Sequence, residues 1–400
     1  MSAPSTHAPT RWITRIIPFV LAGCFGFATY VVIKRVCVDH FIRVRNRPSI
    51  AVGILVPYAV LLLLTLATYL RLNLVIIRDP GIVPLGAEGP QRRGRTRARR
   101  PKGGSPEDPE GRPYVPGPDP NPDSPGLERF YSKDVYVCET DGRPIYCSTC
   151  GTWKPDRAHH SREIDRCVRK MDHYCPWVGG IVSETSFKFF TQFNVYTALY
   201  CIVCLVACGL AVRSRKRHHL PLDGTMVAIL ALAGLFGLFT LGMAFTSLRF
   251  VIMNLTAVES RRGKNVVYQL AVRVPHGTEP PPGCGMLVYP LPTPTEGTNG
   301  RARTREPPSA RDSLATRTFI IVRTEMGENP WDLGPYANWV SVMGRNLFDW
   351  LLPLRQSPCV RSETNESFYP MGPVYAKLRS RYKLPSLSGE AAEIGNGEPI

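Results

Sequence analysis

The sequence predicts an all-α integral membrane protein with four transmembrane helices and a cysteine-rich domain between helices 2 and 3. Four apolar runs each last about 20 residues, the length that a helix needs to cross a hydrocarbon core of about 30 Å. Gly and Pro, 34 and 38 of the 400 residues, concentrate between these runs, and this unevenness excludes a single soluble globule. A compact group of cysteines lies between the second and third runs.

The predicted helices follow the apolar runs at residues 13–33, 49–70, 191–212 and 224–248. Buried helices of a large soluble core are the alternative, but such helices rarely run this long without a charge. The first run could also be an uncleaved signal anchor, which would still span the membrane. Because the number of spans is even, both chain termini and the cysteine-rich segment are expected on the same side.

The segments outside the spans differ in composition. Residues 86–130 are dominated by Gly, Pro and Arg and have little apolar surface to bury, so we expect a disordered linker. Aromatic residues within 327–352 favour short helices docked on the membrane face. The expected organisation is an N-terminal segment at 1–12, transmembrane helices 1 and 2 within 13–70, an Asp-Pro-Gly motif and the disordered basic linker within 71–135, a cysteine-rich domain at 136–190, transmembrane helices 3 and 4 within 191–248 and a C-terminal region at 249–400.

The chain is strongly basic. It has 49 Lys and Arg against 32 Asp and Glu, a formal net charge of +17. Such a surplus indicates an anionic partner, either nucleic acid or a membrane surface. Four spans conflict with a nucleic-acid binder, so we expect membrane lipids as partners and no nucleic acid. Basic residues are nearly balanced across the predicted spans, so the positive-inside rule does not assign an orientation.

The cysteine group has the spacing of a metal site. Cys147 and Cys150 form a C-x-x-C knuckle, and His160 and Cys167 follow at distances that can complete a tetrahedron. Zn²⁺ favours such sets of three cysteines and one histidine. A redox C-x-x-C would need a thioredoxin-like context, which the sequence lacks, and a disulfide would need an oxidising compartment. Zinc would also fold a segment that has too few apolar residues to fold alone.

A second group of reactive residues follows the knuckle. In Asp172-His173-Tyr174-Cys175, a cysteine close to a histidine suggests a thiolate nucleophile with a base, and the aspartate would fix the histidine tautomer. The tetrapeptide alone is a weak signal, because His173 and Cys175 could equally be zinc ligands. The preceding knuckle, the following Pro-Trp pair and a span about 15 residues further on favour the nucleophile.

Taken together, these features resemble the DHHC family of protein S-acyltransferases, which are integral-membrane palmitoyltransferases. The resemblance covers most of residues 13–350. It includes Asp79-Pro80-Gly81 after the second span, residues 256–259 where the family has TTxE, and residues 329–334 in the family's C-terminal motif. The residues that match the family's cysteine-rich pattern in register are Cys147, Cys150, Lys154, Pro155, Arg157, His160, Cys167, Asp172, His173, Cys175, Pro176 and Trp177.

The metal ligands depart from the family pattern. The family binds two zinc ions, each through three cysteines and one histidine, and by resemblance the knuckle set is the first. At the positions of the second set this chain has Ser161, Ile164, Tyr174 and Ile181. We therefore expect one structural zinc ion per chain. Certain fungal members carry Asp-His-Tyr-Cys, and the chain looks most like that branch.

Other departures concern the reaction itself. Ala257 replaces the second Thr of TTxE, which in the family supports the aspartate of the motif. Gly179 and Gly180 stand where the family has Asn. Either loss could slow the chemistry. The alternative function is therefore a membrane adaptor that kept the fold and lost turnover.

The resemblance implies a protein-cysteine S-palmitoyltransferase. His173, oriented by Asp172, is the implied base that takes the proton of Cys175, and Cys175 is the nucleophile that carries the palmitoyl group. Palmitoyl-CoA is the implied long-chain acyl donor, and cysteine-containing proteins are the implied substrates. Tyr200 falls where the family closes the acyl cavity. The residues implied to contact acyl-CoA are Lys154, Arg157, His159, Trp177 and Tyr200.

The chemistry predicts the orientation that the charges do not. Zinc thiolates, a reactive cysteine and CoA all belong in the reducing cytosol. We therefore expect the cysteine-rich domain and both termini in the cytosol, at an endomembrane whose organelle the sequence does not name. The basic hairpin loops would then face the other side, against the usual charge tendency.

Overall fold

The structure is a computed structural model that describes residues 8–86, 127–263, 265–289, 317–360 and 369–387. The chain divides into two compact units. Unit 1 comprises residues 1–81, 172–257 and 335–360, and unit 2 comprises residues 82–171, 258–334 and 361–400. Most of the linker predicted at 86–130 lies outside the described residues.

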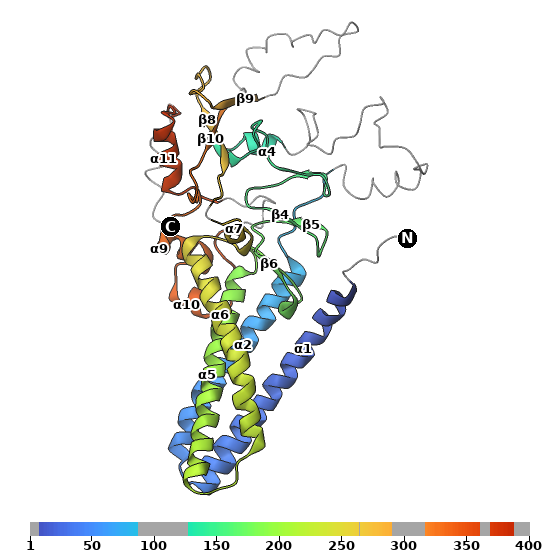
Figure 1. Ribbon diagram of the computed structural model, residues 1–400, viewed down its shortest axis with the longest axis vertical. Coiled ribbons are helices and arrows are strands. Elements are labelled where there is room, and N and C mark those ends of the chain that lie inside the picture. The colour runs from blue at the N-terminus through green and yellow to red at the C-terminus, as the bar shows by residue number, and fades with distance from the viewer. Residues whose placement is uncertain (1–7, 87–126, 264, 290–316, 361–368, 388–400) are drawn as a thin grey trace, which may run out of the picture. The chain divides into compact units, whose positions relative to one another are not determined.

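Unit 1 contains four helices that are long and apolar enough to cross a membrane, at the places where the sequence predicted them. Helix α5 packs against both α2 and α6 (Figure 1). Each helix is longer than the predicted run, because the run marks only the part with a hydrocarbon-like composition. The helices are α1 (Ala8–Thr29) with its π-helical continuation η1 (Tyr30–Val44), α2 (Pro48–Arg78), α5 (Phe187–Arg217) and α6 (Gly224–Met253).

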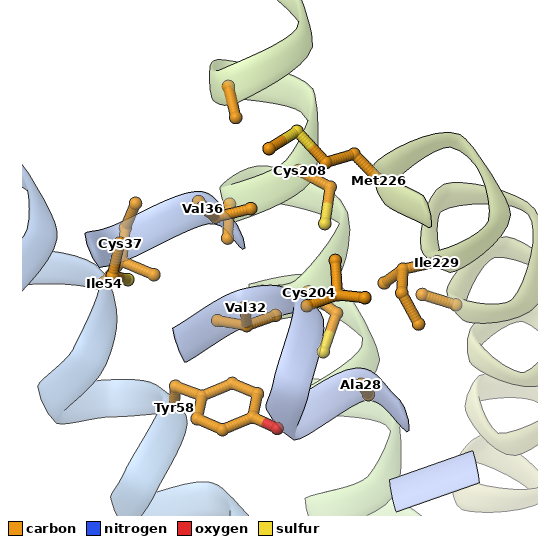
Figure 2. Close-up of a cluster of buried hydrophobic side chains, with 14 of the residues drawn as sticks. Ala28, Val32, Val36, Cys37, Ile54, Tyr58, Cys204, Cys208, Met226 and Ile229 are labelled. Carbon is orange, nitrogen blue, oxygen red and sulfur yellow. The ribbon is translucent and has the colours of Figure 1, made fainter. Parts of the chain in front are cut away.

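Small and branched side chains fill the space between these helices (Figure 2). Val32 and Val36 of η1, Tyr58 of α2, and Cys204 and Cys208 of α5 are all at most 1% exposed. Helices in lipid gain little from the hydrophobic effect and associate through close packing, which small residues permit. The buried cysteines of α5 therefore act as small packing residues.

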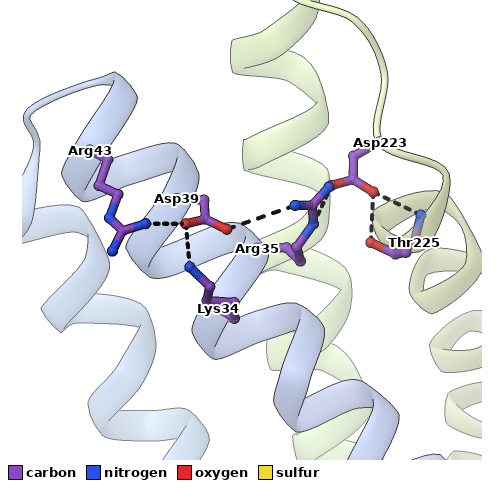
Figure 3. A network of polar contacts seen from close by, with 6 residues as sticks. All are labelled: Lys34, Arg35, Asp39, Arg43, Asp223 and Thr225. Carbon is purple, nitrogen blue, oxygen red and sulfur yellow. Dashed lines mark hydrogen bonds and ion pairs between the residues drawn. The ribbon is translucent and has the colours of Figure 1, made fainter.

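A charged network joins η1 to the start of α6 (Figure 3). Asp39 accepts hydrogen bonds from Lys34 at 2.8 Å and from Arg43 at 3.2 Å. The guanidinium of Arg35 lies 2.8 Å from the carboxylate of Asp223. Asp223 also accepts a hydrogen bond from the backbone N–H of Thr225, in the first turn of α6. The hairpin loop expected after the first span begins later than predicted, because Lys34, Arg35, Asp39 and Arg43 lie on η1, whereas Asp223 lies just before α6.

The Asp-Pro-Gly motif ends α2. Pro80 has no N–H and disfavours a helical conformation at Asp79, so the helix stops at Arg78. Thr185 donates a hydrogen bond to the Asp79 carbonyl at 2.7 Å, and Ser183 donates to the Pro80 carbonyl at 3.0 Å. The motif thereby connects the end of α2 to the segment that enters α5.

Unit 2 contains an antiparallel sheet, so the prediction of an all-α protein is wrong outside the membrane helices. The strand order is β1 (Val135–Val137), β8 (Gln269–Val274), β10 (Arg317–Arg323) and β9 (Gly285–Tyr289). Strands β8 and β10 are rich in β-branched residues, which pack well on a pleated surface. The sheet could not be predicted from the sequence, because its strands are short and far apart along the chain.

Both faces of this sheet are buried. Phe319 and Ile321 of β10 point into an aromatic cluster with α4 (Glu128–Tyr131), while Ile320 and Val322 point to the opposite face. That opposite face is covered by Leu378 of α11 (Pro373–Arg381). Burial on two sides explains why β10 is a nearly continuous apolar run rather than an alternating one.

Three two-stranded hairpins carry the cysteine-rich sequence, and three short helices follow the spans. Strand β2 (Tyr146–Cys147) pairs with β3 (Thr152–Trp153), β4 (His159–Ser161) with β5 (Arg166–Val168), and β6 (His173–Cys175) with β7 (Gly180–Val182) through the turn η2 (Pro176–Val178). The helices are α7 (Ala257–Arg261), α9 (Pro335–Met343) and α10 (Leu347–Leu351).

Candidate active site

The four predicted metal ligands come together in unit 2. The Nδ1 atom of His160 lies 3.6, 3.4 and 4.0 Å from the Sγ atoms of Cys147, Cys150 and Cys167. In tetrahedral zinc with Zn–S of about 2.3 Å and Zn–N of about 2.05 Å, neighbouring nitrogen and sulfur lie about 3.6 Å apart. The donors therefore fit a zinc ion.

The hairpins supply these ligands in register. His160 on β4 pairs directly with Cys167 on β5, and the N–H of Val83 donates to the Cys167 carbonyl at 2.8 Å. Burial and the neighbouring Cys147 both raise the pKa of Cys150. Three neighbouring thiols do not all ionise without a cation, because three adjacent thiolates would repel one another. The three cysteines and the histidine are therefore suited to binding a metal ion. The other ring nitrogen of His160 lies 3.4 Å from Asp165, a common second partner of a ligating histidine.

The proposed nucleophile sits in unit 1 on the β6–β7 hairpin. Cys175 pairs with Gly180 across the hairpin and is 5% exposed. Gly179 closes the turn with φ of +70°, a conformation that glycine adopts without strain. At Gly180 a Cβ atom would lie 2.4 Å from the side chain of Ile76 on α2. Glycine at 180 therefore lets the hairpin that carries Cys175 pack directly on α2.

Asp172 and His173 form a short hydrogen bond. The Oδ2 atom of Asp172 lies 2.6 Å from Nδ1 of His173, and the Asp172 side chain is 5% exposed. Burial alone would lower the pKa of His173, but hydrogen bonds with Asp172 and Cys175 outweigh it and raise the pKa to about 9. The imidazole of His173 therefore holds a proton readily, within hydrogen-bonding reach of Cys175.

A backbone group holds the other oxygen of Asp172. The N–H of Ala257, at the start of α7, donates to Oδ1 at 2.7 Å. The carboxylate is thus fixed from two directions, and one of these contacts needs no side chain at position 257. The expected loss of support from the missing Thr is therefore partly compensated by the main chain.

Cys175 opens into an apolar cavity inside unit 1. The cavity has a volume of about 210 Å³ and is lined by Phe190, Phe193 and Met243 together with His173 and Trp177. The Trp177 ring packs near Phe239 of α6, with 5.8 Å between ring centroids. The surroundings of the thiol are therefore suited to an alkyl chain.

A second cavity, of about 70 Å³, lies in the helix bundle. It shares Leu21, Phe25, Thr197 and Phe236 with the first, so the two are neighbours. Tyr200 is one of the residues that line it, and the Tyr200 hydroxyl lies 2.9 Å from the hydroxyl of Tyr58. Tyr58 in turn lies 2.8 Å from the hydroxyl of Thr29. Three hydroxyl groups from three helices thus meet beside this second cavity.

The other predicted acyl-CoA contacts lie in unit 2 and separate into two kinds. Lys154 and His159 line a polar pocket with Arg262. Burial, followed by the charge of Arg262, lowers the pKa of His159 to about 4, so this imidazole is neutral near neutral pH. Arg157 is different, because its side chain is fully buried and bound through two hydrogen bonds of 2.7 Å to Glu259. Arg157 therefore has a structural partner.

The comparisons with known proteins agree with this geometry. Residues 141–264 match the DHHC palmitoyltransferase family. Over 423 residues the chain is 41% identical to Palmitoyltransferase pfa5 of Aspergillus fumigatus, covering 96% of this chain and 94% of that protein. The chain belongs to the DHHC palmitoyltransferase family. It is also 38% identical to Palmitoyltransferase pfa5 of Emericella nidulans, over 96% of this chain and 88% of that one, and 31% identical to Palmitoyltransferase PFA3 of Saccharomyces cerevisiae, over 57% of each.

In this DHHC palmitoyltransferase, residues at the positions of the family's second zinc site make contacts of other kinds. Ser161 donates a hydrogen bond of 2.7 Å to Glu163. Ile181 is 1% exposed and pairs with Tyr174 across the β6–β7 hairpin. Among the described residues, the knuckle set is the only group of three or more histidine, cysteine and carboxylate side chains close enough to share a metal ion.

Sequence reasoning missed several partners in this DHHC palmitoyltransferase. Glu259 was noted as part of TTxE but not as the partner of Arg157, and Arg262 was not noted at all. Tyr58 and Thr29 were likewise not connected with Tyr200. No local pattern could have found them, because each contact joins segments that are far apart in the sequence.

Proposed function

We propose that this protein moves a long-chain acyl group from palmitoyl-CoA to cysteines of substrate proteins through an S-acyl intermediate on Cys175. One observation carries the proposal. A buried thiol lies beside an imidazole that a fixed carboxylate orients, and the thiol opens into an apolar cavity. This arrangement combines an activated nucleophile with a place for an alkyl chain.

The first transfer acylates the enzyme. His173 takes the proton of Cys175, and Asp172 stabilises the imidazolium that results. The thiolate attacks the thioester carbonyl of palmitoyl-CoA, the new carbon–sulfur bond forms on Cys175, and the bond to the CoA sulfur breaks. CoA leaves as a thiolate and takes up a proton, for which protonated His173 is the nearest donor.

The second transfer acylates the substrate. A cysteine thiol of a substrate protein loses its proton to His173 and attacks the acyl group on Cys175. The Cys175 sulfur is the leaving group and is returned to its starting state. Each step exchanges one thioester for another, so the enzyme contributes mainly proximity, thiol activation and a dry site.

The two apolar cavities support a role in binding the acyl chain. Burying each CH₂ group is worth about 0.8 kcal/mol, so a chain that fits the path gains affinity with length until the path ends. We propose that Tyr200 marks that end. Tyr200→Ala should shift the donor preference toward longer acyl-CoAs in a competition between donors, and an unchanged preference would contradict this role.

Basic residues in unit 2 support CoA binding at its phosphates. Lys154 and Arg262 supply the positive charges of the polar pocket, and His159 supplies a neutral hydrogen-bonding group. The buried ion pair of Arg157 favours a supporting role for that residue, with Trp331 stacked 4.9 Å from its guanidinium.

We propose one structural zinc ion, held by Cys147, Cys150, His160 and Cys167. When bound, zinc cross-links the hairpins of the cysteine-rich segment and takes no part in acyl transfer. Purified protein should contain one zinc per chain by elemental analysis. Cys150→Ser should lose the metal, whereas the half-exposed Cys284→Ser should keep it. Two zinc ions per chain in the wild type would contradict the proposal.

We also propose that the cysteine-rich domain and both termini face the cytosol at an endomembrane. The thiol chemistry and the use of CoA support this orientation. Four apolar helices already indicate a multi-pass membrane protein. Protease treatment of sealed, cytosol-outward vesicles should cleave a tag on either terminus, and protection of both tags would refute the orientation.

Capture of the acyl-enzyme tests the proposed function most directly. The full-length protein is incubated with labelled palmitoyl-CoA, and hydroxylamine-sensitive label is measured. The wild type and Cys284→Ser should be labelled, whereas Cys175→Ser should carry essentially none. Label at Cys175 without transfer to any substrate thiol would favour the adaptor, and absence of label in the wild type would refute the enzyme.

A further inference from the structure

A lysine is buried near the first turn of α5 without a hydrogen-bond partner. Lys188 is 0% exposed, and its Nζ atom has no hydrogen-bond partner among the described residues. An isolated ammonium in an apolar surrounding is strongly unfavourable unless a counter-charge or a hydrogen-bond acceptor is supplied. The proposed acyl transfer makes no use of this residue.

The contacts of its neighbours define where Lys188 lies. Gln192, one turn further along the same face of α5, donates hydrogen bonds to the carbonyls of Asp349 and Trp350 at 3.3 and 2.9 Å. On the other side, Arg71 of α2 lies over the ring of Phe189 at 5.4 Å. Lys188 is therefore held between α2 and the segment that contains α10.

Two charged side chains act on Lys188, the carboxylate of Asp349 and the guanidinium of Arg355. Arg71 donates to the carbonyl of Leu354 at 3.4 Å, and the next residue, Arg355, has a side chain that is 75% exposed. Asp349 is the nearby carboxylate, but it lies 4.0 Å from Arg355 and does not form an ion pair with Lys188 within the described residues. One carboxylate thus faces two cations, Lys188 and Arg355.

Within the described residues, other buried polar atoms of these elements also lack a partner, one of them the acceptor Oε1 of Gln192 and the others donors. The indole N–H of Trp339, on α9, and the hydroxyl of Ser357 are buried without a hydrogen bond among the described residues. The Trp339 ring packs on Trp350 at 5.6 Å, and Ser357 follows Arg355 by two residues. A surplus of positive charge and of hydrogen-bond donors is what an anion with several oxygens requires.

We propose that Lys188 and Arg355 bind the phosphate of an anionic phospholipid headgroup, with Arg71 beside them. Lys188 is the second residue of a membrane-spanning helix, so it lies near the level where headgroup phosphates are found. The long lysine stem can carry the ammonium toward a headgroup while its carbons stay buried. The Arg355 side chain is 75% exposed, so a headgroup can reach it from outside the protein.

The test compares purified full-length protein in nanodiscs of phosphatidylcholine alone and of phosphatidylcholine with phosphatidic acid. We expect phosphatidic acid to raise the melting temperature of the wild type by about 5 °C. Native mass spectrometry should find a retained anionic lipid. Lys188→Met should lose both effects and should be no less stable than the wild type in phosphatidylcholine, because it removes a buried unpaired charge.

Control variants make the outcomes distinct. Arg249→Met removes an exposed charge at the same end of the helices and should respond to phosphatidic acid as the wild type does. Arg355→Gln alters an exposed side chain and should weaken the response without affecting folding. An equal response of Lys188→Met and wild type would overturn the proposal. Stabilisation by soluble phosphate in phosphatidylcholine would instead assign the site to a soluble anion and overturn the lipid.

Discussion

Asp172→Asn is expected to slow acylation of Cys175 by about 10³-fold or more, because the base would lose its orientation and its counter-charge. The asparagine oxygen can still accept the N–H of Ala257, so the fold should persist. Its NH₂ group would then face Nδ1 of His173 as a donor and favour the wrong tautomer. Single-turnover labelling with palmitoyl-CoA measures the rate.

The pH dependence gives this prediction a signature that a purely structural effect would not produce. His173 has its pKa raised to about 9, from an ordinary value of 6.5, so the imidazolium persists through neutral pH and is lost as the pH rises toward 9. The linked stabilisation of the fold is complete below about pH 6.5 and disappears over the same interval. Without the Asp172 carboxylate, His173 should lose its positive charge at a lower pH than in the wild type.

The rate at which iodoacetamide alkylates Cys175 reports this change. Near neutral pH the rate should fall in Asp172→Asn, because less thiolate is paired with an imidazolium. Asp134→Asn removes an exposed carboxylate that pairs with Arg273 and serves as the control. An unchanged alkylation profile together with a loss of less than tenfold in acylation would rule out the orienting role.

Glu259→Gln is expected to destabilise unit 2 by about 3–5 kcal/mol, because it leaves the buried guanidinium of Arg157 without its counter-charge. Burial alone would raise the pKa of Glu259, but Arg157 outweighs this and lowers it, so the native pair is ionised. Arg157 also has φ of +62°, an uncommon conformation that the pair helps to hold.

A second Arg–Glu pair in the same unit provides a matched control. Arg381 binds Glu328 through two contacts of 2.9 and 3.1 Å, but it lies at the surface. Glu328→Gln should cost at most about 1 kcal/mol. Thermal unfolding of both variants compares the effects, and a shift for Glu259→Gln on the order of 10 °C is expected. Equal shifts would mean that burial does not decide the strength of the Arg157 pair.

The parts of the molecule that follow from local sequence were predictable. The four apolar helices follow from uninterrupted apolar length, and the cluster that could hold a metal ion follows from the spacing of Cys147, Cys150, His160 and Cys167. The short helices over 335–351 were also expected from their aromatic residues. In each of these cases a few neighbouring residues decide the structure.

The parts that depend on distant contacts were not predictable. The sheet of unit 2 pairs residues 135–137 with 270–272 and 317–323 with 269–274 and 285–289, and no single strand is long enough to reveal it. Arg157 illustrates the same limit for a site residue. Its family position suggests a phosphate contact, but the partner that occupies its guanidinium is 102 residues away.

The amide hydrogen at position 257 has a consequence for how such enzymes diversify. A contact made by the main chain is available to nearly every amino acid, proline excepted. Substitutions at position 257 can therefore leave the hydrogen bond from the main chain to the Asp172 carboxylate in place. Genome surveys that require threonine there would discard chains whose proton-transfer machinery is still assembled.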